Sequence, residues 1–80
     1  MSTVYLVYHQ HYEDARVIAV VATHGEAVAA ITTVVSLCRY GAENEFLIEK
    51  WALGVGRIHE WTYDYHGVLE SEHAITSKED

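Results

Sequence analysis

The sequence has one cysteine, few basic residues and no long apolar run. A lone thiol cannot form a disulfide within the chain, and Cys38 falls in an apolar helical pattern, which predicts packing as a small hydrophobic side chain. A membrane span needs about 18 to 20 consecutive apolar residues, which are missing here. The start, Met1-Ser2-Thr3, lacks the basic and apolar regions of a signal peptide, so we expect a location in the cytoplasm of a bacterial host cell.

Five lysine and arginine residues face twelve aspartate and glutamate residues, which gives a net charge of −7. The phosphate backbone of nucleic acid is repelled by such a surface, so we expect no direct binding of DNA or RNA. The same charge favours docking on a basic protein surface, including one that normally holds nucleic acid.

Motifs for enzymatic chemistry are also missing. The segment Gly54-Val55-Gly56 lacks the third glycine and the following helix of a nucleotide-binding fingerprint. No Ser, Cys or Thr residue pairs with a base in a nucleophilic pattern. His9 and His11 share one side of an extended segment, about 7 Å apart, but the other histidines have no zinc-ligand spacing. We therefore expect a non-enzymatic protein without a cofactor, and a histidine-based metal or small-ligand site stays as a weaker alternative.

Half of the 80 residues are apolar and 21% are charged, a composition typical of a chain that packs a core. The length fits a single α+β domain over residues 1–66, followed by a polar C-terminal tail over residues 67–80. An apolar share this high in a small domain leaves apolar side chains outside the core, and these favour a protein partner or a second copy.

Two β-hairpins are predicted from runs of β-branched and aromatic residues. The first joins strands at 3–9 and 15–22 through a polar connection, and the second joins strands at 46–53 and 57–65 through the glycines at 54 and 56. Alternation in the last strand places His59, Trp61, Tyr63 and Tyr65 on one face and Ile58, Glu60, Thr62 and Asp64 on the other.

One helix is predicted between the hairpins. Thr23 and Glu26 match the capping box that starts a helix, and Gly41 suits a left-handed cap after an end near Tyr40. An apolar stripe recurs at spacings of three and four residues: Ala27, Ala30, Ile31, Val34, Leu37 and Cys38. The order strand, strand, helix, strand, strand predicts a four-stranded antiparallel sheet of order 2-1-3-4, with the helix on one face.

Several segments carry a resemblance to a known family: residues 4–9, 17–20, the helix start with Glu26-Ala27, and residues 46–51. Over about residues 4–53 the chain resembles a family of small uncharacterised domains found in bacteria and their phages, which has no assigned activity. The sequence differs from that family by lacking a proline-bearing connection after the helix. The resemblance implies a compact accessory protein encoded by a phage or another mobile element.

Three functional hypotheses follow. The leading one is an acidic protein that binds another protein, such as a phage-encoded inhibitor of a host or defence complex that covers a nucleic-acid-binding surface, as an anti-CRISPR protein does. Carboxylates that mimic DNA phosphates and aromatic side chains would make the contact: Glu13, Asp14, Glu43, Glu45, Glu60, Asp64, Trp61, Tyr63 and Tyr65. The alternatives are an assembly module that forms a homodimer through the uncovered face of the sheet, and the histidine-based site.

Overall fold

A computed structural model describes residues 2–37, 41 and 43–75 of the chain. The predicted helix end at Tyr40 and the predicted packing of Cys38 lie outside the described residues. The elements follow in this order: β1 (Thr3–His11), β2 (Asp14–Val21), α1 (His24–Leu37), β3 (Asn44–Ala52), β4 (Gly56–Tyr63) and β5 (Leu69–Ala74). No helix among the described residues is long and apolar enough to cross a membrane.

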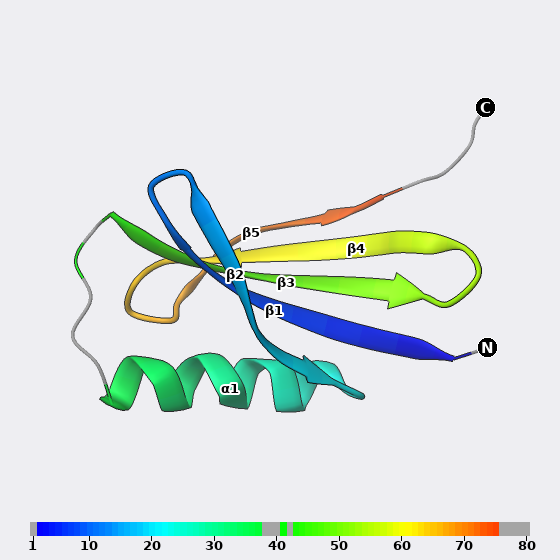
Figure 1. Ribbon diagram of the computed structural model, residues 1–80, viewed down its shortest axis with the longest axis horizontal. Helices are drawn as coiled ribbons and strands as arrows, with labels where there is room; N and C mark the ends of the chain where they lie inside the picture. Colours follow the sequence, from blue (N-terminus) through cyan, green and yellow to red (C-terminus); the bar gives the residue numbers. More distant parts are fainter. Residues whose placement is uncertain (1, 38–40, 42, 76–80) are drawn as a thin grey trace.

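The strands form one antiparallel sheet, and α1 lies along one side of it (Figure 1). The predicted α+β class with one helix is confirmed, but the prediction of four strands in order 2-1-3-4 was wrong, because the sheet has five strands in order β2-β1-β3-β4-β5. The fifth strand comes from residues 69–74, which the sequence interpretation placed in a polar tail. Every residue of β5 is exposed, so β5 is held by backbone pairing with β4. Its sequence has no apolar pattern that would predict a strand.

A turn after β4 folds β5 back along the sheet. The carboxylate of Asp64 accepts hydrogen bonds from the backbone N–H groups of His66 and Val68, each at 2.9 Å, and Gly67 supplies a positive φ of 83°. The hydrogen bond from Val68 is the main reason why the pKa of Asp64 lies below its usual value. Asp64 is therefore a turn residue and does not extend the face of β4 that carries Glu60.

A β-bulge in β2 changes which side chains share a face. Val7 pairs with Ala19 and Tyr8 pairs with Val17, so Ile18 is an extra residue in β2. Strict alternation predicts Val17 on the same face as Ala19, and this was wrong. The bulge places Val17 on the face of Val20, away from the helix.

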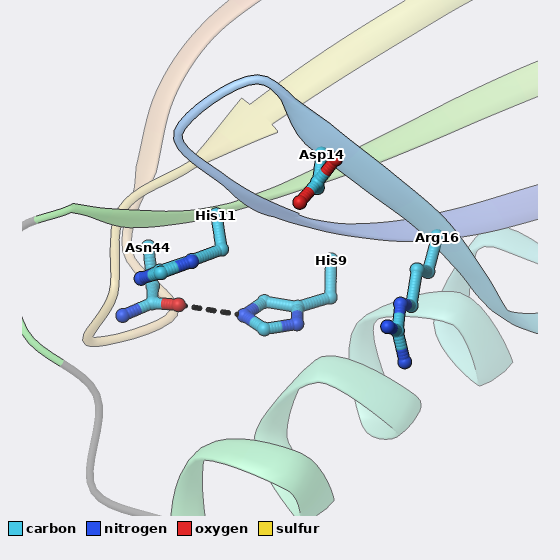
Figure 2. A pocket seen from close by; sticks show the side chains of 5 residues that line it. All are labelled: His9, His11, Asp14, Arg16 and Asn44. Carbon is cyan, nitrogen blue, oxygen red and sulfur yellow. Dashed lines mark hydrogen bonds between the residues drawn. The ribbon is translucent and has the colours of Figure 1, made fainter.

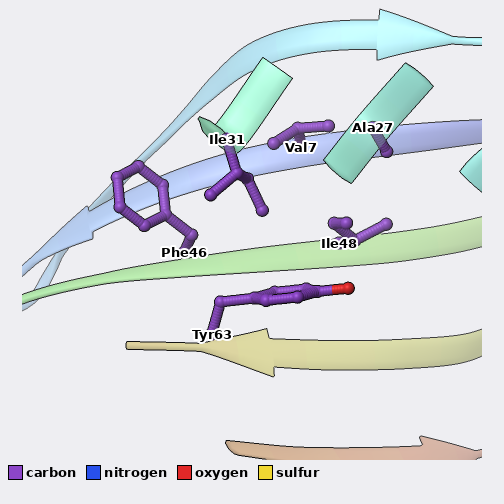
Figure 3. Packing of buried hydrophobic residues seen from close by; sticks show 6 residues of the cluster. All are labelled: Val7, Ala27, Ile31, Phe46, Ile48 and Tyr63. Carbon is purple, nitrogen blue, oxygen red and sulfur yellow. The ribbon is translucent and has the colours of Figure 1, made fainter. Parts of the chain in front are cut away.

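The core lies between α1 and the middle of the sheet (Figure 3). Six side chains form it, each at most 5% exposed: Val7, Ala27, Ile31, Phe46, Ile48 and Tyr63. The predicted helical stripe is confirmed at its centre, since Ala27 and Ile31 are buried. It is wrong at its end, because Leu37 is 78% exposed.

The sequence predicts a capping motif at each end of α1. The capping box is confirmed, because the Glu26 N–H donates to the Thr23 hydroxyl oxygen at 3.1 Å, and the Thr23 N–H donates to the Glu26 carboxylate at 3.2 Å. The predicted left-handed cap at Gly41 follows residues 38–40, which lie outside the described residues, so it stays a prediction.

The turn between β1 and β2 contains a strained residue. Tyr12 has a φ of 57° and a side chain that is 72% exposed, and bulky side chains rarely adopt this left-handed conformation. Asparagine tolerates it better, so Tyr12→Asn should raise the free energy of unfolding by about 0.5–1 kcal/mol, measured by urea denaturation. The matched change Tyr5→Asn, in an ordinary strand conformation, should lower it; a gain there as well would show that strain at Tyr12 is not the cause.

Candidate protein-binding surface

The face of the sheet opposite α1, called the open face below, is lined by alternate residues of the central strands. Phe46 and Ile48 of β3 pack in the core beneath α1, so the residues between and after them point the other way. By strand register, these residues share the open face with side chains of β1 and β2: Leu6, Tyr8, Val17, Val20, Leu47, Glu49 and Trp51. The only helix of the described residues lies on the other side of the sheet (Figure 1).

The edge of the open face carries uncovered apolar side chains. On β2, Val17 is 49% exposed, Ile18 is 38% exposed and Val20 is 61% exposed. Single exposed apolar residues are ordinary on protein surfaces, whereas larger contiguous apolar patches favour contact with another molecule. Among the described strands, β2 is also at the edge of the sheet, where one row of its backbone groups has no strand beside it. Burial of this edge against an apolar protein surface would therefore be favourable in free energy.

A carboxylate lies almost fully buried in the middle of the open face. Glu49 is only 6% exposed, and it accepts hydrogen bonds from Trp51 Nε1 at 3.0 Å and Arg57 Nη1 at 2.7 Å. The Tyr8 hydroxyl also hydrogen-bonds to it. Burial raises the pKa of Glu49, but these three hydrogen bonds and the nearby positive charge outweigh burial, so the pKa lies below its usual value.

This network fixes three side chains of the types that dominate protein interfaces. Trp, Tyr and Arg are the residues most enriched at binding hot spots, and Trp51, Tyr8 and Arg57 converge on the one carboxylate. Burial raises the pKa of Tyr8 foremost, with a further rise from Glu49, so the hydroxyl stays protonated and donates. Because their orientations are set in the free protein, a partner need not order these side chains on binding.

The carboxylates predicted to contact a partner do not form one array. Glu45 and Glu60 lie on the open face, with Glu60 directly opposite Glu49. Asp14 pairs with His11, and the Glu43 carboxylate lies 3.9 Å from His11 Nε2, both at the far end of the sheet on the helix side. The remaining two are in turns: Glu13 between β1 and β2, and Asp64 after β4.

The predicted partner-binding aromatics lie elsewhere too. Tyr63 is part of the core at 5% exposed. Trp61 lies on the helix side, stacked between His24 at 4.3 Å and His59 at 4.2 Å between ring centroids. Tyr65 is in the turn after β4, against His66. The aromatics of the open face are Tyr8 and Trp51 instead. For Trp51, the sequence signal was its position two residues after Glu49 on the same strand, which places both side chains on one face.

Histidines do not assemble into a metal site within the described residues. No group of three or more His, Cys, Asp or Glu side chains lies close enough there to hold a metal ion. The two histidines of the predicted pair contact different groups, since His9 hydrogen-bonds to Asn44 and His11 lies near Glu43. His59 pairs with Glu72 at 2.9 Å.

The open face brings together uncovered apolar side chains on β2, interface-type residues held by Glu49, and two further carboxylates, Glu45 and Glu60. Residues of the types held by Glu49 are enriched at the centres of protein interfaces. Comparison with protein-family models, with curated proteins and with solved structures finds no match for this chain.

Proposed function

We propose that this chain is a non-enzymatic protein-binding module that docks through its open face. The observation that carries the proposal is Glu49, a carboxylate 6% exposed on a sheet face that no described element covers. Burying a carboxylate is costly unless it is well hydrogen-bonded, and here its hydrogen bonds organise Trp51, Tyr8 and Arg57 beside the apolar edge of β2. A surface prepared in this way suits contact with a folded partner.

The charges on this face indicate the chemistry of the partner. Arg57 is neutralised by Glu49, so Glu45 and Glu60 leave the open face acidic, in a chain whose net charge is −7. We infer a partner with an apolar centre and a basic rim. A groove that holds nucleic acid has such a rim, so an inhibitor carried by a phage or mobile element that covers this groove is the specific form of the proposal.

Val20→Asp tests the docking surface. Val20 is 61% exposed, so the change should leave the fold intact while placing a charge in the apolar edge. A protein captured from a lysate of the source organism by the tagged wild type should bind this variant at least about tenfold more weakly. Thr33→Asp, an exposed change on α1 on the other side of the molecule, is the matched control and should bind like the wild type.

A second pair of variants tests the charge of the partner. Glu45→Lys with Glu60→Lys should weaken the same complex, and free duplex DNA should compete for the captured protein if its basic groove is the target. Equal binding by wild type, Val20→Asp and the double variant would refute docking through the open face. A wild type that captures nothing and forms a dimer by light scattering, which Val20→Asp converts to a monomer, would instead support the assembly module.

A further inference from the structure

A polar hollow of about 410 Å³ lies on the helix side of the sheet, where β1 ends and β2 and β3 begin (Figure 2). Its lining residues are His9, His11, Asp14, Arg16 and Asn44. Strand register brings them together: Arg16 pairs with His9, while Asp14 and Asn44 pair with His11 from either side. The volume is typical of pockets that hold small molecules.

Hydrogen bonds within the protein set the orientation of the groups at the back of the hollow. Asn44 is 5% exposed, and its Nδ2 donates to the Gly41 carbonyl at 3.4 Å. Its Oδ1 therefore accepts from His9 Nε2 at 2.9 Å, as Figure 2 shows. The rim is held as well, because the Tyr12 N–H donates to the Glu43 carbonyl at 3.4 Å, and Tyr12 has the strained φ described above.

Arg16 is the basic residue that lines the hollow. It makes no ion pair or hydrogen bond with any described residue, although Asp14 lies two positions away on the same strand. Arg57, by contrast, is neutralised by Glu49. Figure 2 shows the guanidinium of Arg16 on the same side of the sheet as the ring of His9, and Asp14 at the start of β2, next to the turn. The hollow therefore combines a guanidinium and two imidazoles with the carboxylate of Asp14, and the Glu43 carboxylate lies 3.9 Å from His11 Nε2.

We propose that this hollow binds the phosphate group of a small molecule. The planar fork of an arginine matches phosphate oxygens, and the ring N–H of His11 can supply a further donor, while the Nε2–H of His9 is already bound to Asn44 Oδ1. Asp14 at the edge accepts hydrogen bonds, which suits a hydroxyl group next to the phosphate. The site is separate from the docking surface, because it lies on the opposite face of the sheet.

Titration with inorganic phosphate at neutral pH, followed by NMR, tests the site. Phosphate should shift the ring signals of His9 and His11 and the side-chain signal of Arg16, with a dissociation constant on the order of 1 mM. Arg16→Gln should weaken binding by about tenfold or more. Lys50→Gln removes the same charge from the same sheet face outside the hollow, so it should change binding by less than about twofold.

A second experiment tests whether Asp14 binds a hydroxyl group next to the phosphate. Ribose 5-phosphate should bind more tightly than inorganic phosphate, and Asp14→Asn should remove this gain while leaving inorganic phosphate binding in place. No shift at His9, His11 or Arg16 would overturn the proposal, as would equal weakening by Arg16→Gln and Lys50→Gln, which would show general charge attraction. Acetate that binds as tightly as phosphate would overturn the assignment to phosphate.

Discussion

Phe46→Ala should lower the free energy of unfolding by about 3–5 kcal/mol, the largest loss expected from any single change discussed for this chain. Phe46 is fully buried and is the largest of the fully buried side chains. Alanine would leave a cavity between α1 and β3 that the neighbours Val7 and Ile31 cannot fill. Small domains have total stabilities near the low end of about 5–15 kcal/mol, so urea denaturation should show a variant that is barely folded.

Leu47→Ala is the matched control for this prediction. Leu47 is the next residue of β3 and is only half-buried, on the open face. Its truncation removes less buried apolar surface and should cost about 1 kcal/mol. Equal losses for the two variants would contradict a core located on the helix side of the sheet alone.

Glu49→Gln should have the second largest effect on stability. The change removes the negative charge that Arg57, Trp51 and Tyr8 share. Weakening hydrogen bonds to a buried charged group costs about 1–3 kcal/mol, and we expect a loss in this range at neutral pH by urea denaturation. Glu60→Gln, directly opposite on β4, is the control. The Glu60 carboxylate makes no hydrogen bond to a described residue, so this variant should lose less than about 0.5 kcal/mol of stability.

The effect of Glu49→Gln should depend on pH in one direction. The folded pKa of Glu49 lies below its usual value of 4.5, so the carboxylate stabilises the fold fully above that value. This contribution falls as the pH drops through the folded pKa, where the carboxylate becomes protonated. The stability difference between wild type and variant should therefore be constant near neutral pH and shrink in acid. A difference that grows in acid would show that the Glu49 network opposes folding.

Local signals in the sequence located much of the fold. The capping box of Thr23 and Glu26 starts α1 through contacts within one helical turn, so sequence alone suffices for it. The two hairpins and the buried positions Ala27 and Ile31 also follow from short-range patterns. The α+β class results from these elements, because one helix and two hairpins have few ways to bury their apolar faces.

The candidate sites depended on register between distant segments. Both faces of β1 and β2 are apolar, so only the position of α1 decides that Val7 is buried while Val17 and Val20 stay uncovered. The Glu49 network joins β1, β3 and β4, and Arg57 reaches it only because a bulge places Arg57 opposite Trp51. No short-range pattern encodes such a bulge.

The sequence by itself determined the helix start, the two hairpins, the buried helix positions Ala27 and Ile31 and the acidic charge, because each depends on neighbouring residues or on composition. Tertiary structure alone decided the fifth strand, the faces of Trp61 and Tyr63, and the hollow around Arg16 and His9. The physical reason is that β5 is held by backbone pairing without an apolar pattern. Faces and hollows, in turn, arise where strands from different parts of the chain are brought into register.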